Sequence, residues 1–234
     1  MMLIVILLSQ SVEAFLGRNI SLGIMGKLTL LFTAIAVLIT VIPAIFLRLK
    51  TFCFTLWVNL PFQIYSIVAL LSTTWSLYPE ETLKASITLI CFHLTGTAIA
   101  SMFSWRAIWL GLAWGILFLA ICSIVIIPHD GLMTDVQAGS FRGLWMEKNA
   151  AGEAMAIGAM ACMVVAVADR NPNYLLGMVL LIGLTLYARA AGALAASCVA
   201  IAFIVFVETL RKGPVRFFTG TWLAVVIVGL IGLY

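Results

Sequence analysis

The sequence predicts an all-α protein, a polytopic transmembrane helical bundle of about eight to nine spans. Of its 234 residues, 64% are hydrophobic and 9% charged, and the mean hydropathy is +1.20, which leaves too few polar side chains to cover a water-soluble fold. Its apolar runs reach the roughly 20 residues that cross a bilayer, without the alternation of barrel strands. We therefore expect one transmembrane domain over residues 1–234, with outer loops near 72–84 and 128–148.

Charge and cysteine usage argue against several classes of ligand. The net charge is +4, and the basic residues are scattered over short loops, a distribution that does not favour a nucleic acid partner. All five cysteines fall inside apolar runs, and none forms a C-x-x-C pair. We predict no metal, no cofactor and no nucleic acid.

The first part of the chain predicts a short apolar start and one full span. The opening run MMLIVILLSQSVEAFLGRN lacks a basic n-region and a small-residue cleavage site, so it is interpreted as a short first span or its remnant. Leu28 to Leu47 predicts a span that stops at Arg48 and Lys50, which would anchor it on the cytoplasmic side.

The next span, Phe52 to Leu71, contains Asn59 and Pro61, and a kink is expected because proline leaves a backbone carbonyl without its partner. The interval Ser72 to Lys84 combines interfacial aromatics with a Pro-Glu-Glu helix start, which predicts an outer loop leading into a helix.

The rest of the chain predicts six further spans. Their boundaries follow the remaining apolar runs: Ala85–Phe103, Ala107–Ile127, Asn149–Ala168, Tyr174–Ala188, Ala190–Leu210 and Phe217 to the end. Lysine and arginine are slightly more frequent on the face that holds the dense cluster RKGPVR, so the positive-inside rule places this cluster in the cytoplasm and the long polar loop outside.

Two stripes of small residues recur at a spacing of four. Such stripes let helix backbones approach closely, and packing inside one subunit is preferred over a dimer interface. The stripes are Ala150, Ala154, Gly158 and Cys162 in one span and Ala188, Gly192, Ala196 and Ala200 in another.

The candidate site is an anion site at the end of the long loop. Lys148 and Asn149 lie where the loop turns into a span, and Arg142 precedes them. A helix N-terminus presents free N–H groups and about half a positive charge. Arg189 opens a second span at the same face, and arginine forks suit phosphate oxygens. The arrangement predicts a diphosphate site at the outer membrane boundary; the alternative is that Arg142 and Lys148 pair with loop carboxylates.

Several side chains near this site are candidates for acid–base chemistry. Glu153 lies one turn inside the span, and Glu147 immediately precedes Lys148; either carboxylate would be a base if burial raised its pKa, or would neutralise a nearby cation. His129 in the loop is a second catalytic candidate. Outside the site, His93 is interpreted as a hydrogen-bonded packing histidine. Four tryptophans are interpreted as membrane-interface anchors: Trp75, Trp105, Trp109 and Trp145.

Three segments, in this order, resemble the O-antigen ligase and Wzy-type exopolysaccharide polymerase superfamily. They are WSLYPEETLKAS, FRGLWMEKNAAGEAMAIGAM and LTLYARAAGALAAS, within roughly Leu71 to Leu210. The second is the most specific, since it matches the family's R-G-x-x-x-x-K-N-x-x-G segment.

The resemblance implies a polytopic glycosyltransferase of the bacterial inner membrane. Its donor would be a glycan on a polyprenyl diphosphate, used at the periplasmic face without metal or nucleotide sugar, with membrane lipid and other polysaccharide-assembly proteins as further partners. Arg142, Lys148 and Arg189 match the positions that hold the diphosphate, and Asn149 belongs to the same segment.

The chain departs from the family pattern in two ways. Hydroxyl residues expected around Arg189 are replaced by Ala188, Ala190 and Ala191. The family also continues into a large periplasmic loop with a catalytic histidine, so we expect this chain to be a fragment, a truncated form or a half that works with a partner. The alternative function is a non-catalytic membrane subunit of polysaccharide assembly or export, or a small-solute transporter.

Overall fold

The computed structural model describes residues 22–130, 132–133, 138–145 and 147–211, and for 22–30, 32–33 and 126–130 it describes the backbone alone. Within these ranges the chain is helical, apart from connections and one isolated antiparallel bridge between Leu132 and Phe141. The all-α prediction is therefore confirmed. The predicted opening and final spans lie outside the described residues.

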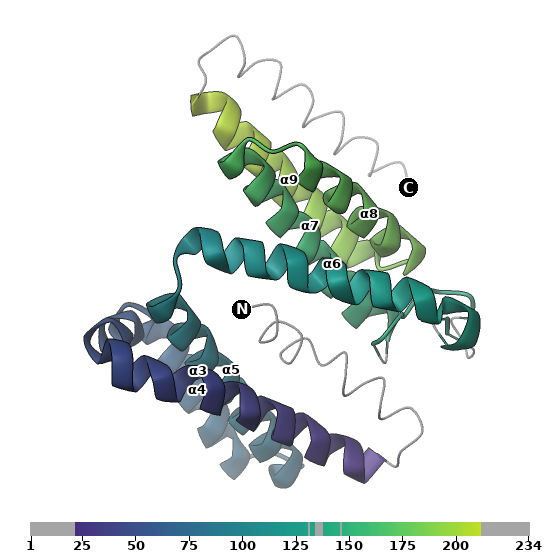
Figure 1. Cartoon of the computed structure of the whole chain (residues 1–234). Helices are drawn as coiled ribbons and strands as arrows, with labels where there is room; N and C mark the ends of the chain where they lie inside the picture. The colour runs from purple at the N-terminus through teal and green to yellow at the C-terminus, as the bar shows by residue number, and fades with distance from the viewer. Residues whose placement is uncertain (1–21, 131, 134–137, 146, 212–234) are drawn as a thin grey trace. The chain divides into compact units, whose positions relative to one another are not determined.

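The chain divides into two compact units. The described part of one of them, Leu16–Ile108, contains α3, α4, η1, α5 and the first turn of α6. The helix α3 (Leu22–Val58) packs against α5 (Pro79–Met102), with a small core of Val41, Ala44, Phe52 and Ala98 between them. The second unit holds most of α6 and all of α7, α8 and α9 (Figure 1). The prediction of a single transmembrane domain stays a prediction.

Helix α3 is kinked at the predicted end of its first span. The span was expected to stop at Arg48, and Arg48 has non-helical backbone angles (φ −142°, ψ 36°) that kink α3 there into two helical parts. Arg48 and Lys50 are both exposed.

The expected kink in the next span lies at Asn59. Helix α3 ends at Val58, and α4 (Leu60–Leu71) begins after Asn59 with Pro61 in its first turn. Proline lacks an amide hydrogen and suits the start of a helix, so the helical hydrogen bonding is interrupted here. The amide of Asn59 still donates to the carbonyl of Thr55, and its carbonyl accepts from the amide of Gln63. The 3-10 turn η1 (Ser72–Thr74) then leads to α5, whose first turn carries the predicted Pro79, Glu80 and Glu81.

In the second unit, three consecutive helices, each antiparallel to the one before it, lie beside α6 (Trp105–Asp130). They are α7 (Lys148–Asp169), α8 (Asn173–Tyr187) and α9 (Ala191–Arg211). Each begins and ends within two residues of the predicted span. Because α8 returns the chain, α7 and α9 run in the same direction and contact each other (Figure 1).

Glycine and small residues allow the helices of this unit to pack closely. A Cβ on Gly158 would lie 2.5 Å from Ile116 Cγ2 and 2.9 Å from Leu181 Cδ1, so α6, α7 and α8 meet at this residue. Cys162, one turn further along α7, is fully buried. This part of the first small-residue stripe is an internal packing seam, as predicted, whereas Gly192 and Ala196 of the second stripe are exposed.

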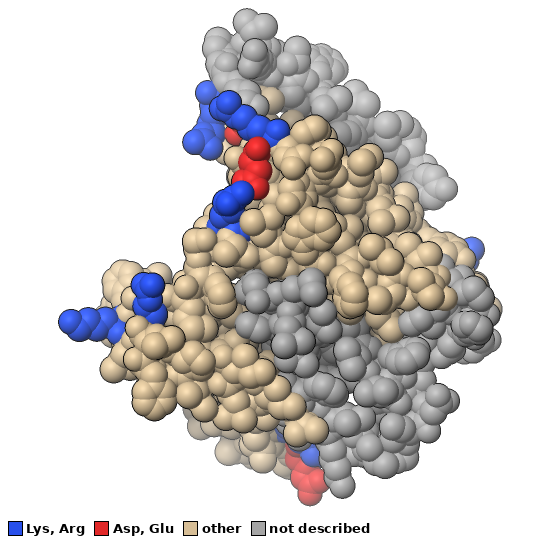
Figure 2. Space-filling view, in the orientation of Figure 1, with Lys and Arg blue, Asp and Glu red and all other residues tan. Residues whose placement is uncertain are grey.

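Five of the described helices are long and apolar enough to cross a membrane, and two shorter apolar helices accompany them. Uncharged residues dominate the described part of the face drawn in Figure 2, and charged ones gather in a few places. These helices indicate a membrane protein.

Candidate functional site

The starts of α7 and α9 lie side by side. A Cβ on Gly152, in the second turn of α7, would lie 2.3 Å from the Ala190 Cβ, a separation that real side chains do not adopt. Glycine is therefore required at 152 for the two helix starts to approach this closely. The two helix N-termini predicted to converge at one face do so.

A pocket of about 300 Å³ opens between these helix starts. Asn149 and Glu153 of α7 line one side, and Ala190, Gly192 and Ala193 line the other. The α9 side carries no bulky group, since a Cβ on Gly192 would meet nothing within 4 Å. The pocket therefore has one polar wall and one wall of small residues.

Both helices begin with amides that have no partner within the helix. In α7, the first amide with a helical acceptor is that of Ala151, which donates to the Glu147 carbonyl at 3.1 Å. At the start of α9, the first is that of Leu194, which donates to the Ala190 carbonyl at 3.0 Å. The three amides at the start of each helix lack such an acceptor, and no side chain caps α7. Two positive helix ends thus face the same pocket.

Arg189 has a strained backbone immediately before α9. Its φ is +55°, in the left-handed region that glycine occupies at low cost. Its amide donates to the Leu186 carbonyl at 2.9 Å, and the amide of Ala190 donates to the Thr185 carbonyl at 3.5 Å. This pattern ends a helix at a left-handed residue. An exposed arginine thus occupies the usual position of a C-terminal glycine.

The long loop is held against the end of α8. The amide of Phe141 donates to the carbonyl of Tyr187 at 3.3 Å, and their rings stack with centroids 5.6 Å apart. Phe141 is fully buried. Since Arg142 follows Phe141 and Arg189 lies two residues after Tyr187, this contact brings the two arginine-bearing segments together.

A second contact fixes the loop to α6. The amide of Leu144 donates to Ser123 Oγ at 3.2 Å, and Gly143 turns the chain there with φ +57°. A Cβ on Gly143 would lie 2.6 Å from Ser123 Cβ, so no other residue fits. The end of the loop that leads into α7 is therefore positioned by packing.

Trp145 corrects the sequence interpretation. Predicted to anchor the membrane interface, it is 2% exposed and belongs to the core between α6, α7 and α8. The loop was expected to be polar, but its F-R-G-L-W segment buries Phe141, Leu144 and Trp145. The contacts of this segment with Ser123 and Tyr187 join residues far apart in the sequence, so local composition did not predict the burial.

The structure brings together some of the predicted site residues and leaves others outside the pocket. Asn149 and Glu153 line it, whereas Lys148, half-buried at the first position of α7, and Arg189, next to Ala190, do not. Arg142 is half-buried in the loop. The side chain of His129 lies outside the described residues. Among those described, no three His, Cys, Asp or Glu side chains cluster as metal ligands would.

The fold and site define an all-helical membrane protein with two parallel helix starts around a small pocket. Comparison with protein-family models, with curated proteins and with solved structures finds no match to this chain.

Proposed function

We propose that this chain is a glycosyltransferase-type protein of exopolysaccharide or O-antigen synthesis, a multi-pass protein of the bacterial inner membrane with about eight to nine spans. It would polymerise or ligate glycan from a polyprenyl-diphosphate donor at the periplasmic face. The diphosphate would lie at the paired starts of α7 and α9, held by Arg142, Lys148, Asn149 and Arg189.

The observation that carries this proposal is the contact between Phe141 and Tyr187. It ties the segment with Arg142 to the segment with Arg189, and the close approach at Gly152 adds the start of α7 to both. Two guanidinium groups, an ammonium group and two helix N-termini supply positive charge for a diphosphate. Retaining a strained arginine at 189 is typical of a functional position.

Among the residues whose side chains the structure describes, Glu153 is the candidate for the base that deprotonates the acceptor hydroxyl. It lines the pocket, and an acceptor hydroxyl beside a bound diphosphate would be within reach of an exposed carboxylate on the first turns of α7. Removal of the hydroxyl proton would let the oxygen attack the sugar carbon, and the diphosphate would leave with its electron pair held by the cations.

Three single substitutions test the proposal in cells that depend on this protein for polymer. Arg142→Ala, Lys148→Ala and Arg189→Ala should each abolish glycan elongation or transfer while membrane insertion stays normal. Arg48→Ala is the control, because Arg48 is an exposed cation in the other unit. Polymer of normal length from all three variants would contradict the proposal.

One observation favours a small-solute transporter as a second candidate. The break between α3 and α4 at Asn59 is typical of the interrupted helices at transporter sites. Polar side chains lie near it: Ser66 Oγ is 3.5 Å from Nδ1 of His93, whose ring packs edge-on against Phe62. If deletion of the gene changes solute uptake and leaves polysaccharide chain length unchanged, the transporter is correct.

A further inference from the structure

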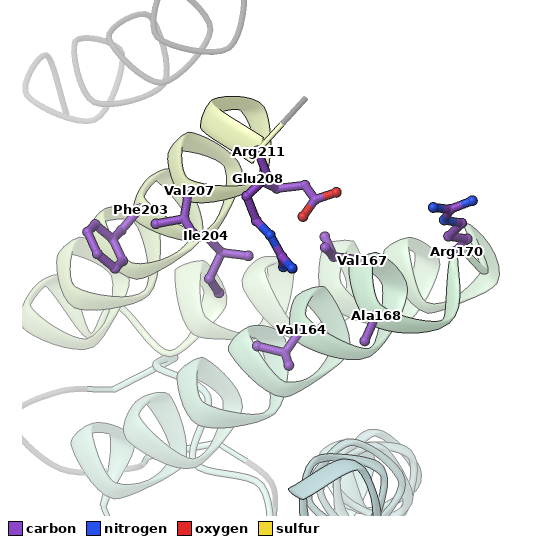
Figure 3. Close-up of a pocket in the computed structure, with 9 residues that line it drawn as sticks. All are labelled: Val164, Val167, Ala168, Arg170, Phe203, Ile204, Val207, Glu208 and Arg211. Atoms are coloured by element: carbon purple, nitrogen blue, oxygen red, sulfur yellow. The ribbon is translucent and has the colours of Figure 1, made fainter. Parts of the chain in front are cut away.

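The opposite end of the α7 and α9 pair has a larger groove. A cavity of about 560 Å³ lies between the last turns of the two helices, far along both from the paired starts. Its apolar walls are Val164 and Val167 of α7 and Phe203, Ile204 and Val207 of α9 (Figure 3). Phe203 is 64% exposed and Val207 38%, so the groove is open to its surroundings.

Charged side chains lie only at one end of this groove. Arg170 follows the end of α7, and Glu208 and Arg211 belong to the last turn of α9. Figure 3 shows the Arg211 side chain reaching back from α9 over the groove toward α7, beside Val167. Two guanidinium groups and the Glu208 carboxylate line this end of the groove, and guanidinium groups suit the oxygens of a phosphate.

The spacing of charge and apolar wall matches a lipid. From Phe203 to Arg211 the helix rises roughly 12 Å, and from Val164 to Arg170 roughly 9 Å. Both helices are long enough to cross a membrane and end at these arginines, so the guanidinium groups lie at one membrane boundary and the apolar walls extend inward from it. A phospholipid has its phosphate and acyl chains arranged in this order.

Arg170 ends α7 with a left-handed backbone. Its φ is +52°, and it caps α7 where glycine would cost less. An arginine near a helix C-terminus also complements the helix dipole, but a lysine or arginine inside the last turn would do so without strain. The presence of an arginine at this left-handed position is therefore explained by its guanidinium group and not by its backbone.

We propose that this groove binds an anionic phospholipid, with the phosphate between Arg170 and Arg211 and an acyl chain along the valine and isoleucine walls. The guanidinium groups supply the forked hydrogen bonds that phosphate oxygens accept. The site is separate from the diphosphate pocket and does not depend on the proposed function. By the charge distribution of the loops it faces the cytoplasmic leaflet.

The test measures thermal stability of the purified full chain in detergent doped with defined lipids. Phosphatidylglycerol should raise the melting temperature, whereas phosphatidylcholine, phosphatidylethanolamine and soluble glycerol phosphate should not. The double variant Arg170→Gly with Arg211→Gln should need about tenfold more phosphatidylglycerol for the same shift, since two charge-assisted hydrogen-bonding groups are lost.

Two further variants separate the groove from general charge and folding effects. Arg48→Gln with Lys50→Gln removes two exposed cations elsewhere and should respond as the wild type does. Val207→Trp keeps both arginines but fills the apolar wall, and should also lose the response. A full phosphatidylglycerol shift in both the double arginine variant and Val207→Trp would overturn the proposal, as would stabilisation by glycerol phosphate alone or a preference for phosphatidylethanolamine.

Discussion

Arg170 and Arg189 are the only non-glycine residues with positive φ in the described part of the chain. Each ends a helix where glycine is the ordinary residue, and each lies at one end of the α7 and α9 pair. A left-handed conformation costs a non-glycine residue about 1 kcal/mol or more. Both proposed binding sites therefore contain an arginine kept at an energetic cost.

The substitution Arg189→Gly should separate stability from activity. The free energy of unfolding should rise by about 1 kcal/mol, because the backbone strain is relieved, while glycan transfer is lost with the guanidinium group. Denaturation in detergent and polymer length in cells are the two measurements. Arg189→Ala is the matched variant: it should lose activity without the gain in stability, and equal stability of the two variants would contradict the strain argument.

Gly143 has both a positive φ and no room for a side chain. Gly143→Ala should lower the free energy of unfolding by about 2 kcal/mol or more, since a Cβ would meet Ser123 at 2.6 Å and the backbone would be strained. Gly139→Ala shares the positive φ but has open space around it, so it should cost about 1 kcal/mol. Equal losses would show that the contact with Ser123 does not hold the loop.

At the scale of elements, α7 is the helix around which the second unit packs. Its small residues set the approach of α6 and α8 at Gly158 and of α9 at Gly152. Apolar transmembrane helices gain little from hydrophobic burial against lipid, so such close backbone contact is a main source of their association.

A pair of glycine substitutions tests this role of α7. Gly158→Ala should destabilise the chain by about 1–3 kcal/mol, because the new methyl group overlaps Ile116 and Leu181. Gly183→Ala, in α8 with nothing within 4 Å, should be neutral or stabilising by about 0.5 kcal/mol. Thermal unfolding of both proteins in the same detergent gives the comparison; a neutral Gly158→Ala would argue against the seam.

Helix positions were predictable from the sequence because apolar runs, proline and acidic first turns determine them locally. The ends of α7, α8 and α9 fall within two residues of expectation, and Pro61 marked the break at Asn59. The kink of α3 at Arg48 likewise falls where the first basic residue after an apolar run predicted the end of a span.

The loop before α7 was predicted poorly. Its charged residues suggested a polar segment, but Phe141 stacks on Tyr187 and the amide of Leu144 donates to Ser123, and both partners are far away in the sequence. Long-range contacts of this kind are not visible in local composition. The close approach of the starts of α7 and α9 was expected from the spans, whereas the contact of the loop with Tyr187 was not.

For the whole molecule, the two proposed sites require a particular topology of α7 and α9. The starts of α7 and α9 should face the periplasm and their ends the cytoplasm. In a cysteine-free variant, single cysteines at Asn149 and Gly192 should react with an impermeant thiol reagent added to intact cells, while one at Asn173, exposed at the start of α8, should react only after the membrane is opened. Labelling of 149 and 192 from opposite sides would exclude a shared site.

The central claim is that the paired starts of α7 and α9 bind a diphosphate. Its most direct test is the affinity of the purified protein for farnesyl diphosphate, a short polyprenyl diphosphate, measured by thermophoresis. The wild type and the Arg170→Gly, Arg211→Gln variant should bind it equally, and Arg189→Ala should bind at least about tenfold more weakly. Binding that is unaffected by Arg189→Ala, or that is absent from the wild type, would contradict the account.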